Sequence, residues 1–435
     1  MEESLEIAIV GGGIAGISLA LGLHTRNINV KVYERGKSLR EIGAGIGFTS
    51  NAERAMLALD PRIYHAFKKV AAQNASDWYY WVDASDYSGD GMNGNGLSED
   101  LIHKMDLGPR GFEGCHRAAF LDEIVKLLPV ERVVFDKGLV DIVDGENSGK
   151  LVLKFSDGTV ERADAVIGCD GIRSRVRQLI LGEDNPASYP SYTHKYAFRG
   201  LVPMEKAKEI FSYKKAFSRH IHIGYDAHAV TFPVAGGTLL NVVAFVTDTN
   251  PWPFKEKLTA PGTKSEAVAA FSKFHPTFRA IIHLLPEELS KWAVFDMKDH
   301  PAPTYSRGCI AVCGDAAHAS SPYHGAGAGF AIEDALVLAE LFENAAGKKR
   351  GDRARMVRAV LESYSEVRLE RTQWLVEGSR FMGEMYEWQH GRDRERCRDE
   401  IEWRSRRIWD FDVGKMVVDA VGVFEGKLDQ LNGVH

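Results

Sequence analysis

The residues best suited to bind a ligand form a glycine-rich run near the N-terminus, Gly11-Gly12-Gly13-Ile14-Ala15-Gly16. An apolar, β-branched run at 7–10 precedes it and an apolar run at 17–23 follows it, which predicts a strand, a tight turn and a helix. The amides at the start of such a helix, together with its dipole, bind phosphate groups. We expect Gly11 at the tight turn, Gly13 where the backbone approaches a pyrophosphate, and Gly16 where the helix packs on the strand.

A second apolar run at 30–33 ends at Glu34, which stands 18 positions after Gly16. A carboxylate at the end of the second strand accepts hydrogen bonds from both ribose hydroxyls of an adenosine nucleotide. The pattern therefore predicts a dinucleotide site, although by itself it does not separate FAD from NAD. The residues assigned to this site are Gly11, Gly13, Ile14, Ala15, Gly16, Glu34 and Arg35.

The composition limits the classes of protein to which the chain can belong. Its 435 residues suggest two or three domains, and 54 Lys and Arg against 60 Asp and Glu argue against a nucleic-acid partner. Five scattered cysteines without a Cys-x-x-Cys pair predict no disulfide framework and no metal site, and they favour a reduced, cytoplasmic protein. The uncharged run 7–23 follows an acidic segment and contains five glycines, so we expect neither a signal peptide nor a membrane span.

Four later segments carry further candidate residues. Cys169-Asp170-Gly171 and Gly314-Asp315-Ala316 each follow an apolar, strand-like run. Gly325-Ala326-Gly327-Ala328 opens a helix predicted at 330–340, and Arg117 stands at the start of another predicted helix. A carboxylate, a cation and two turns with small residues, far apart in sequence, are together typical of a site assembled by the fold.

These segments and the N-terminal run resemble the group A flavoprotein aromatic hydroxylases, which have the para-hydroxybenzoate hydroxylase fold, and particularly their salicylate-hydroxylase-like branch with its fungal phenol-dearomatising members. The matching motifs run from residue 7 to about residue 340. The resemblance implies an α/β fold with a Rossmann-type FAD-binding domain, an inserted, mostly antiparallel β-sheet domain that binds the substrate, and C-terminal helices. It also implies non-covalent FAD, with NAD(P)H as a transient co-substrate that has no Rossmann unit of its own.

The resemblance further implies a role for each matching residue. Arg117 and Asp170 are expected near the flavin pyrophosphate, and Asp170 is also linked to the use of the nicotinamide nucleotide; the alternative for Asp170 is a cap for the next helix. Asp315 is expected to bind the ribityl chain. Segment 41–46, which includes Gly45, is expected beside the flavin ring. Amides at the helix start would face the ring and stabilise negative charge on it, and the residues assigned there are Gly325, Gly327 and Ala328.

The order of the motifs along the chain predicts interleaved domains. We expect an FAD-binding domain from residues 1–75, 105–183 and 295–345, a substrate-binding sheet domain from 76–104 and 184–294, and a helical region at 346–435. Strand-like runs predict a mostly antiparallel sheet over the flavin, and they lie at 197–202, 220–224, 228–234 and 239–246. The last helical segment either packs on the body or forms a dimer contact.

Arg199 is the candidate for orienting a substrate. It resembles the arginine that holds the phenolate in fungal members of the family, since a fixed cation lowers the pKa of a phenol and positions it. The alternative is a structural ion pair. The catalytic candidates are Arg199, Tyr323 and His324, and the candidates for contact with substrate are Arg199, Tyr225, His228, Phe232, Pro322 and Tyr323.

The resulting hypothesis is an FAD-dependent monooxygenase, monomeric or homodimeric, that uses NAD(P)H and O2 to hydroxylate a small phenolic ring through a flavin C4a-hydroperoxide. Bacterial salicylate hydroxylases have Pro-His-Gln-Gly where this chain has Pro322-Tyr323-His324-Gly325. Salicylate and a larger, alkylated resorcylic phenol therefore both stay open, as do decarboxylation and dearomatisation. Two other readings are an enzyme of the same fold that epoxidises an alkene or reduces a polyprenyl chain, and a flavin-binding interaction protein without turnover.

Overall fold

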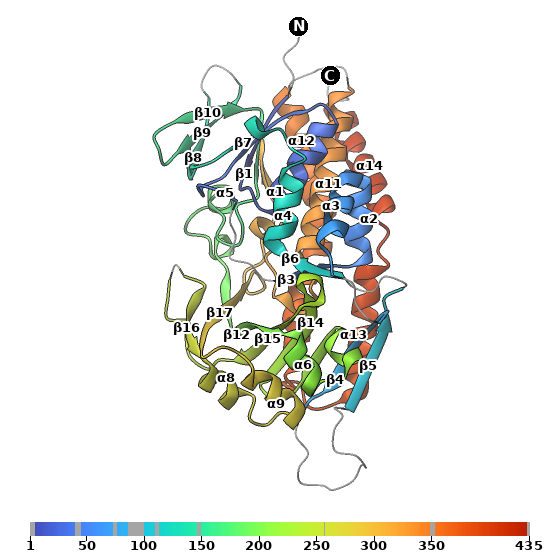
Figure 1. Cartoon of the computed structure of the whole chain (residues 1–435). Coiled ribbons are helices and arrows are strands. Elements are labelled where there is room, and N and C mark those ends of the chain that lie inside the picture. The colour runs from blue at the N-terminus through green and yellow to red at the C-terminus, as the bar shows by residue number, and fades with distance from the viewer. Residues whose placement is uncertain are drawn as a thin grey trace.

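The computed structural model describes residues 5–39, 45–72, 76–85, 100–108, 113–145, 149–255, 257–348 and 353–432. Figure 1 shows one half of the molecule built around a largely parallel sheet and another half built around a larger sheet, with long helices along one side. None of the described helices is long and apolar enough to cross a bilayer.

The first half is organised by a six-stranded sheet whose central strand is β1. This strand pairs in parallel with β2 on one side and with β11 on the other, and β11 pairs in parallel with β19. The strands predicted at 7–10 and 30–33, and those before Asp170 and Asp315, are therefore confirmed. In spatial order the sheet contains β18 (Ser306–Arg307), β19 (Ile310–Val312), β11 (Ala165–Gly168), β1 (Glu6–Val10), β2 (Asn29–Tyr33) and β7 (Val133–Val134).

Helices close over this sheet and bury its apolar side chains. The helix predicted after the glycine run is α1 (Ile14–Thr25), which packs against α11 (Gly327–Ala346) and α2 (Ser50–Leu59) in one apolar core. Helix α11 begins at Gly327 rather than at 330, because the small residues before Phe330 already have helical backbone. The remaining helices of this half are α3 (Pro61–Val70), α4 (Arg117–Val125), α5 (Arg175–Leu181) and α10 (Asp315–His318).

The second half is organised by an eight-stranded sheet. Its neighbouring strands are antiparallel except for β13 and β4, which are parallel, so the prediction of a mostly antiparallel sheet is confirmed. In spatial order the sheet contains β16 (Thr259–Thr263), β17 (Glu288–Asp296), β12 (Ser191–Pro203), β15 (Leu239–Thr247), β14 (Ala227–Val234), β13 (His220–Ile223), β4 (Trp78–Asp83) and β5 (Asp100–Asp106).

Short helices cover the outer face of this sheet, and the face toward the first half is left to form a site. Helices α6, α8 and α9 lie beyond the sheet in Figure 1, and their apolar side chains share a core with it. The bounds of these helices and of the small helix near them are α6 (Met204–Ile210), α7 (Tyr213–Ala216), α8 (Lys264–Ala270) and α9 (Pro276–His283).

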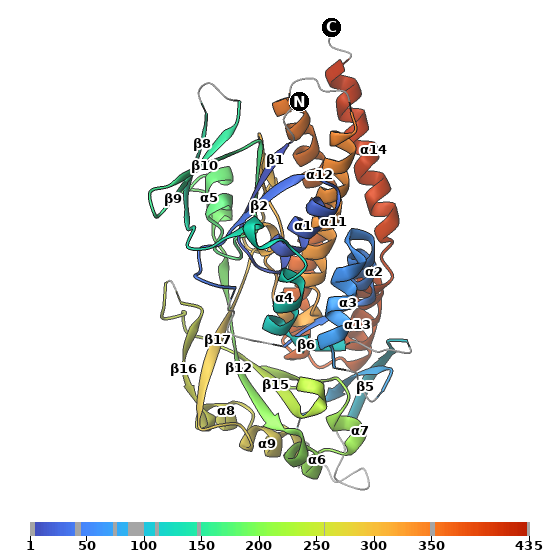
Figure 2. The ribbon, with the colours of Figure 1, turned by 45° about the horizontal axis from the view of Figure 1, so that its top comes forward.

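The C-terminal helices join the two halves. Helix α12 (Arg353–Tyr386) has 34 residues, so it is about 51 Å long. Near its start it packs against α11, and at its end the Tyr386 hydroxyl accepts a hydrogen bond from Trp81 of β4 at 3.0 Å. Helix α13 (Arg394–Trp409) contacts β5, and α14 (Val413–Asn432) runs along α11 and α12 (Figure 2). The last helical segment thus packs on the rest of the chain, which was one of the two alternatives predicted for it.

Two small sheets complete the fold. Strands β8 (Leu139–Asp144), β9 (Leu151–Phe155) and β10 (Val160–Ala163) form one of them, with Gly158 at positive φ in the turn between β9 and β10. Strand β3 (Gly45–Phe48) pairs with β6 (Glu113–His116), so that Gly45 lies opposite His116 and beside the start of α4. This second pair brings two distant segments to the boundary between the halves.

Candidate active site

The glycine run forms a tight loop between β1 and α1. Gly11 has a φ of +106°, and a Cβ atom there would lie 2.4 Å from the carbonyl oxygen of Cys169. A Cβ atom at Gly16 would lie 2.0 Å from the carbonyl oxygen of Gly11. Both contacts are far too short for any side chain, so the loop accepts only glycine at these two positions. Helix α1 starts directly afterwards with no side-chain cap at Gly13, which leaves its first amides for a ligand.

Glu34 lies at the end of β2 and fixes this loop. Its carboxylate accepts hydrogen bonds from the amides of Gly12 and Gly36, each at 2.7 Å. The carboxylate is thereby held beside the glycine loop, and its contact with a ribose stays a prediction. Arg35 is exposed and does not line the cavity described next.

A cavity of about 300 Å³ lies between the two halves, at the C-terminal ends of the parallel strands. Open α/β sheets bind ligands at this edge. Segments from along most of the chain meet there. The predicted site residues that line it are Gly13, Ile14, Ala15, Gly45, Arg117, Arg199, Phe232, Asp315, Pro322, Gly325, Gly327 and Ala328.

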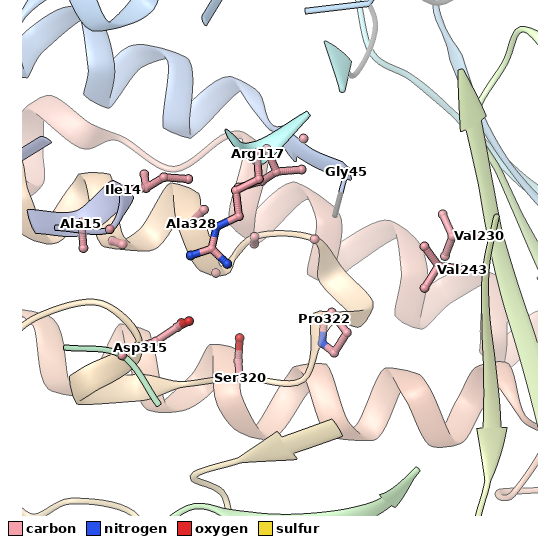
Figure 3. A pocket seen from close by; sticks show the side chains of 18 of the residues that line it. Ile14, Ala15, Gly45, Arg117, Val230, Val243, Asp315, Ser320, Pro322 and Ala328 are labelled. Atoms are coloured by element: carbon pink, nitrogen blue, oxygen red, sulfur yellow. The ribbon is translucent and has the colours of Figure 1, made fainter. Parts of the chain in front are cut away.

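Arg117 and Asp315 reach into this cavity from opposite walls (Figure 3). Arg117 is the first residue of α4 and Asp315 the first residue of α10. Ser320 extends from the same wall as Asp315. A cation, a carboxylate and a hydroxyl around one cavity suit a ligand that carries both anionic groups and hydroxyl groups.

The N-terminus of α11 forms a third wall. Gly325 has a φ of +64° and Ala326, which has no capping side chain, precedes the first turn of a 20-residue helix. Gly327 and Ala328 line the cavity, so the positive end of this helix dipole is directed at it. Of the segment expected beside the flavin ring, residues 41–44 lie outside the described residues, whereas Gly45 and Ile46 line the cavity.

Asp170 does not line the cavity, although its neighbours Cys169 and Gly171 do. Its carboxylate accepts hydrogen bonds from the Ser174 hydroxyl at 2.5 Å and from the amide of Arg175 at 2.7 Å, at the start of α5. Burial raises the pKa of Asp170 in spite of these bonds. The contacts are those of the helix cap that was the alternative interpretation, and a role toward a nicotinamide nucleotide stays a prediction.

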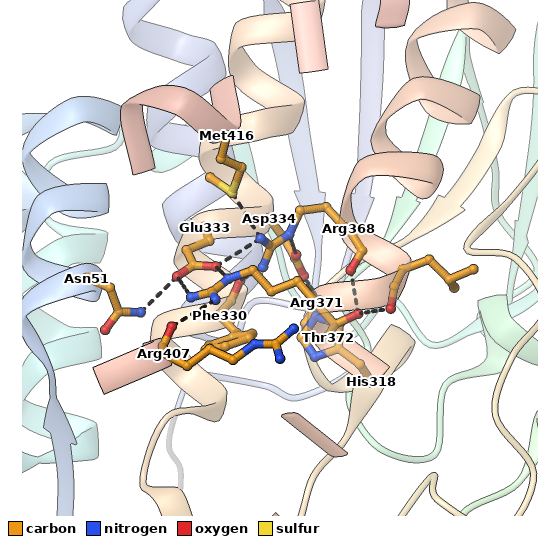
Figure 4. A network of polar contacts seen from close by, with 12 residues as sticks. Asn51, His318, Phe330, Glu333, Asp334, Arg368, Arg371, Thr372, Arg407 and Met416 are labelled. Carbon is orange, nitrogen blue, oxygen red and sulfur yellow. Dashed lines mark hydrogen bonds and ion pairs between the residues drawn. The ribbon is translucent and has the colours of Figure 1, made fainter. Parts of the chain in front are cut away.

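A buried ionic cluster holds the turn that presents Asp315 (Figure 4). Asp334 of α11 accepts hydrogen bonds from the Gly314 amide at 2.9 Å and from His318 Nε2 at 2.6 Å, and both residues flank Asp315 in sequence. Arg368 of α12 donates to Asp334 at 2.7 Å. We call the following residues the ionic cluster: Asn51, His318, Glu333, Asp334, Arg368 and Arg371.

Arg199 lies on β12 and faces the cavity. Within the described part of the chain no carboxylate pairs with it, and its Nε has no hydrogen-bond partner. Its guanidinium stacks over the Trp292 ring at 4.6 Å. Burial, with a further contribution from neighbouring Arg117, lowers the pKa of Arg199 to about 10. This environment does not match the structural ion pair that was the alternative, and it suits an anionic ligand.

Sequence reasoning missed a third cation of the cavity wall, Arg219. It lies just before β13, its guanidinium is over the Tyr79 ring at 4.3 Å, and it shares a hydrogen bond with the Tyr79 hydroxyl. Burial lowers its pKa. The pairing of His220 with Thr231 puts Arg219 opposite Phe232, so the register between β13 and β14 was the signal that could have revealed it. Other missed lining residues are Gly47, Val230, Val243, Phe245, Ser320 and Ala331.

Of the residues predicted for catalysis or contact with substrate, four do not line the cavity. The predicted contact of Tyr225 with substrate is not supported by its position. Tyr225 is 47% exposed in the turn after β13, at the opposite end of that strand from Arg219. His228 is buried and bonds Glu387 at 2.9 Å. Tyr323 packs its ring against His228 at 5.0 Å and so covers it. His324 points toward Trp374 of α12, where burial and Arg404 lower its pKa to about 3.

The chemistry of these walls fits FAD. The first amides of α1 and the Arg117 guanidinium match a pyrophosphate. The Asp315 carboxylate matches the hydroxyls of a ribityl chain, and the small residues at the start of α11 let the backbone approach a planar ring. Apolar side chains on the sheet close the far side, and these are Val230, Phe232, Val243 and Phe245.

Comparison with protein families agrees with this assignment. The family model of an FAD binding domain matches residues 143–379, which is more than half of the chain. A second model, FAD-NAD(P)-binding, matches residues 8–173 and so covers the glycine loop. The two matches overlap and together extend from β1 to α12.

Individual proteins are similar along nearly the whole chain. An FAD-dependent monooxygenase, pigN, from Monascus ruber is 57% identical, with 96% of each chain covered. A dual trans-enoyl reductase/FAD-dependent monooxygenase from Aspergillus terreus, tazHJ, is 55% identical over 99% of this chain, which spans 62% of that longer protein. A solved salicylate hydroxylase substrate complex is 31% identical with a TM-score of 0.82, covering 96% of this chain and 98% of the other.

The order of the motifs, the geometry of the cavity and these similarities all point to one cofactor and one kind of enzyme. The chain belongs to the FAD-dependent monooxygenases of the salicylate hydroxylase type, and FAD is its cofactor.

Proposed function

We propose that the enzyme uses NAD(P)H and O2 to hydroxylate a phenolic ring of the salicylate or alkylated resorcylic class. The observation that carries this proposal is Arg199, a partly buried cation without a protein carboxylate in the described residues, beside apolar side chains on the sheet face of the cavity. A phenolate would compensate its charge and be oriented by it. Ionising the phenol also makes the ring carbons ortho and para to oxygen more electron-rich, which an electrophilic oxygen requires.

The side chains around Arg199 support the same substrate class. Val230, Val243 and Phe245 present apolar surface that fits the face of a ring and excludes water. Arg219 provides a second cation at the edge of this surface, three strands away from Arg199. When bound, FAD supplies the oxygen-transfer chemistry, and NAD(P)H supplies two electrons so that the second oxygen atom leaves as water.

A panel of phenols tests the proposal. Salicylate, 2,4-dihydroxybenzaldehyde and its alkylated derivatives would be incubated with the FAD-bound enzyme, NADH or NADPH, and isotopically labelled O2. We expect at least one phenol to accelerate nucleotide oxidation and to gain one labelled oxygen. The product mass also separates simple oxygen gain from oxygen gain with loss of carbon dioxide.

Two outcomes would contradict the proposal. One is stoichiometric hydrogen peroxide with every phenol and no labelled product. The other is labelled product from an isolated alkene but from no phenol, which would favour the non-aromatic alternative. If neither NADH nor NADPH reduces the bound flavin, with or without phenol, the interpretation as a flavin-binding protein without turnover is favoured.

A further inference from the structure

A second cavity of about 480 Å³ adjoins the flavin cavity and shares two lining residues with it, Gly45 and Arg199. It lies over the eight-stranded sheet, where β17, β12 and β15 are neighbours, and it is partly open to solvent. None of the roles assigned above uses this space. Its volume offers room for a substantial part of a ligand.

The two cavities have a common floor. Side chains two apart on a strand share one face, and each residue advances the strand by about 3.4 Å. On β15, Val243 lines the first cavity and Leu239 the second, so the floor continues for about 13 Å along that strand. On β12, Arg199 and Leu201 continue in the same way, in the row that pairs with β15.

Arg199 stands at the junction of the two cavities. Its guanidinium stacks on Trp292, which lines the second cavity, while Arg199 itself lines both. A phenolate bound by Arg199 would therefore place the adjoining ring positions at the opening to the second cavity. A substituent ortho or meta to the phenolic oxygen on that side of the ring would continue along the floor instead of meeting protein.

The walls of the second cavity select the nature of that substituent. Leu201, Val234, Leu239 and Trp292 form an apolar surface beside the polar side chains of His116, Asn241 and Ser290, and Leu201 is 48% exposed although it is a large apolar side chain. Burying such exposed apolar surface on a hydrocarbon chain is favourable.

The rim of the second cavity disfavours a phosphate. The exposed Glu288 carboxylate lies there, and its negative charge would repel a phosphate group. The lining therefore favours a hydrocarbon chain over a nucleotide.

We propose that the second cavity binds an apolar chain carried by the phenolic substrate, so that the ring lies in the first cavity and the chain extends past Arg199 over Leu201 and Leu239. This inference rests on the proposed function, since it assumes a phenolic ring at Arg199. It identifies the substrate class as chain-bearing phenols and makes Leu201 and Leu239 determinants of chain-length selectivity.

A series of 5-alkylresorcinols tests this inference on the FAD-bound enzyme. Orcinol and 5-pentylresorcinol differ by four methylene groups, and a fully buried methylene strengthens binding about fourfold. In a partly open cavity we expect 5-pentylresorcinol to bind at least about tenfold more tightly than orcinol, both in calorimetric titration and in KM. Leu201→Trp and Leu239→Trp, which fill the cavity from two strands, should each reduce that ratio about tenfold.

The control variant is Val160→Trp, which adds the same side chain at an exposed position of β10 and should leave the ratio unchanged. Circular dichroism and flavin content establish that each variant is folded and loaded. The inference is overturned if the wild-type ratio is close to one, if both cavity variants keep the wild-type ratio, or if they raise the KM for NAD(P)H instead. Calorimetric titration measures the ratio without turnover, so these outcomes are distinguishable from failure of the proposed function, which would leave every phenol without labelled oxygen.

Discussion

Two groups of arginines, each with little exposure to solvent, lie beside the same cavity and have opposite electrostatic environments. In the ionic cluster, burial opposes the charge of Arg368, but Asp334 and Glu333 more than offset that effect and raise the pKa of the guanidinium. At the cavity wall, burial lowers the pKa of Arg199 to about 10, and a neighbouring arginine lowers it further. Both side chains are charged at neutral pH, yet the protein supplies the compensating anions for only one of them.

The comparison separates structural from ligand-binding charge. A buried ion must be paired by protein or by a ligand, because an uncompensated charge in a low-dielectric interior is costly. Arg368 is paired in the chain itself, at 2.7 Å from Asp334 and 2.9 Å from Glu333. Arg199 is stacked on an aromatic ring, which leaves its charge available to a substrate. Removing Arg368 should therefore lower the stability of the fold, whereas removing Arg199 should lower turnover and leave stability nearly unchanged.

The largest expected effect is on folding. Arg368→Ala would leave Glu333 and Asp334 with fewer counter-charges in the core, and breaking a buried pair in this way costs about 3–5 kcal/mol. We expect the free energy of unfolding, measured by denaturant titration, to fall by that amount. A matched control is Arg406→Ala on α13, where the exposed pair with Glu402 at 3.0 Å should contribute less than about 1 kcal/mol. Equal losses for both variants would contradict the distinction between the two groups.

The next largest effect is on turnover without loss of stability. Arg199→Ala should lower kcat/KM for a phenolic substrate by about 10²–10³-fold, the range seen when a preorganised electrostatic contact is removed. The free energy of unfolding should stay within about 1 kcal/mol of the wild type, because no protein partner in the described residues loses its counter-charge. Arg199→Lys should recover part of the activity. If Arg199→Ala leaves turnover unchanged, the alternative of an enzyme that acts on a non-aromatic substrate is favoured.

A smaller effect is expected on cofactor affinity. Asp315→Asn would replace a charged hydrogen-bond acceptor in the cavity wall by a neutral amide, and such a bond contributes about 1.5–3 kcal/mol. We expect the dissociation constant for FAD, measured by flavin fluorescence, to rise about tenfold or more. Asp399→Asn, a change of the same kind at an exposed position on α13, should have no effect. Unchanged FAD affinity in the Asp315 variant would remove that residue from the site.

The smallest effect is a change of stability with pH. Burial alone would raise the pKa of Asp334, but His318 and Arg368 outweigh it and lower the pKa to about 2. Because this is below the ordinary value of 3.8, the contribution of Asp334 to stability is fully present above pH of about 4 and is lost as the pH falls toward about 2. We expect a loss on the order of 1–2 kcal/mol across that interval. Asp334→Asn should flatten this part of the stability profile, and a profile as steep as that of the wild type would contradict it.

Local patterns were sufficient to predict the parts of the fold that depend on neighbouring residues. Strand β1, the glycine loop and α1 follow from a continuous apolar run, a turn and helical spacing. The parallel pairing of β13 with β4 could not be predicted. More than a hundred residues separate the two strands, and the sequence of neither strand indicates which strand it pairs with. The bounds of α12 were also not predictable, since its many charges are typical of a solvated face although they include the buried Arg368.

The candidate site was predictable where motifs mark it and not where packing decides. Asp315 follows a strand-like run and Arg117 starts a predicted helix, and both line the cavity. His228 lies on the same strand face as Val230 and Phe232, but the Tyr323 ring covers it, which depends on how η4 (Pro322–His324) folds over the sheet. Arg219 precedes an apolar strand and resembles an ordinary surface charge until the register places it.

Helix α12 has a mechanical consequence for how substrate enters. It carries Arg368 in the ionic cluster of one half, and its last turns lie in a shared apolar core with the sheet of the other half. Because one continuous helix packs against both halves, a hinge motion that separates them would require α12 to bend or break. Substrate and product must then pass through openings already present between the halves or move by small local motions, and the second cavity beside Arg199, which is partly open to solvent, provides such a route.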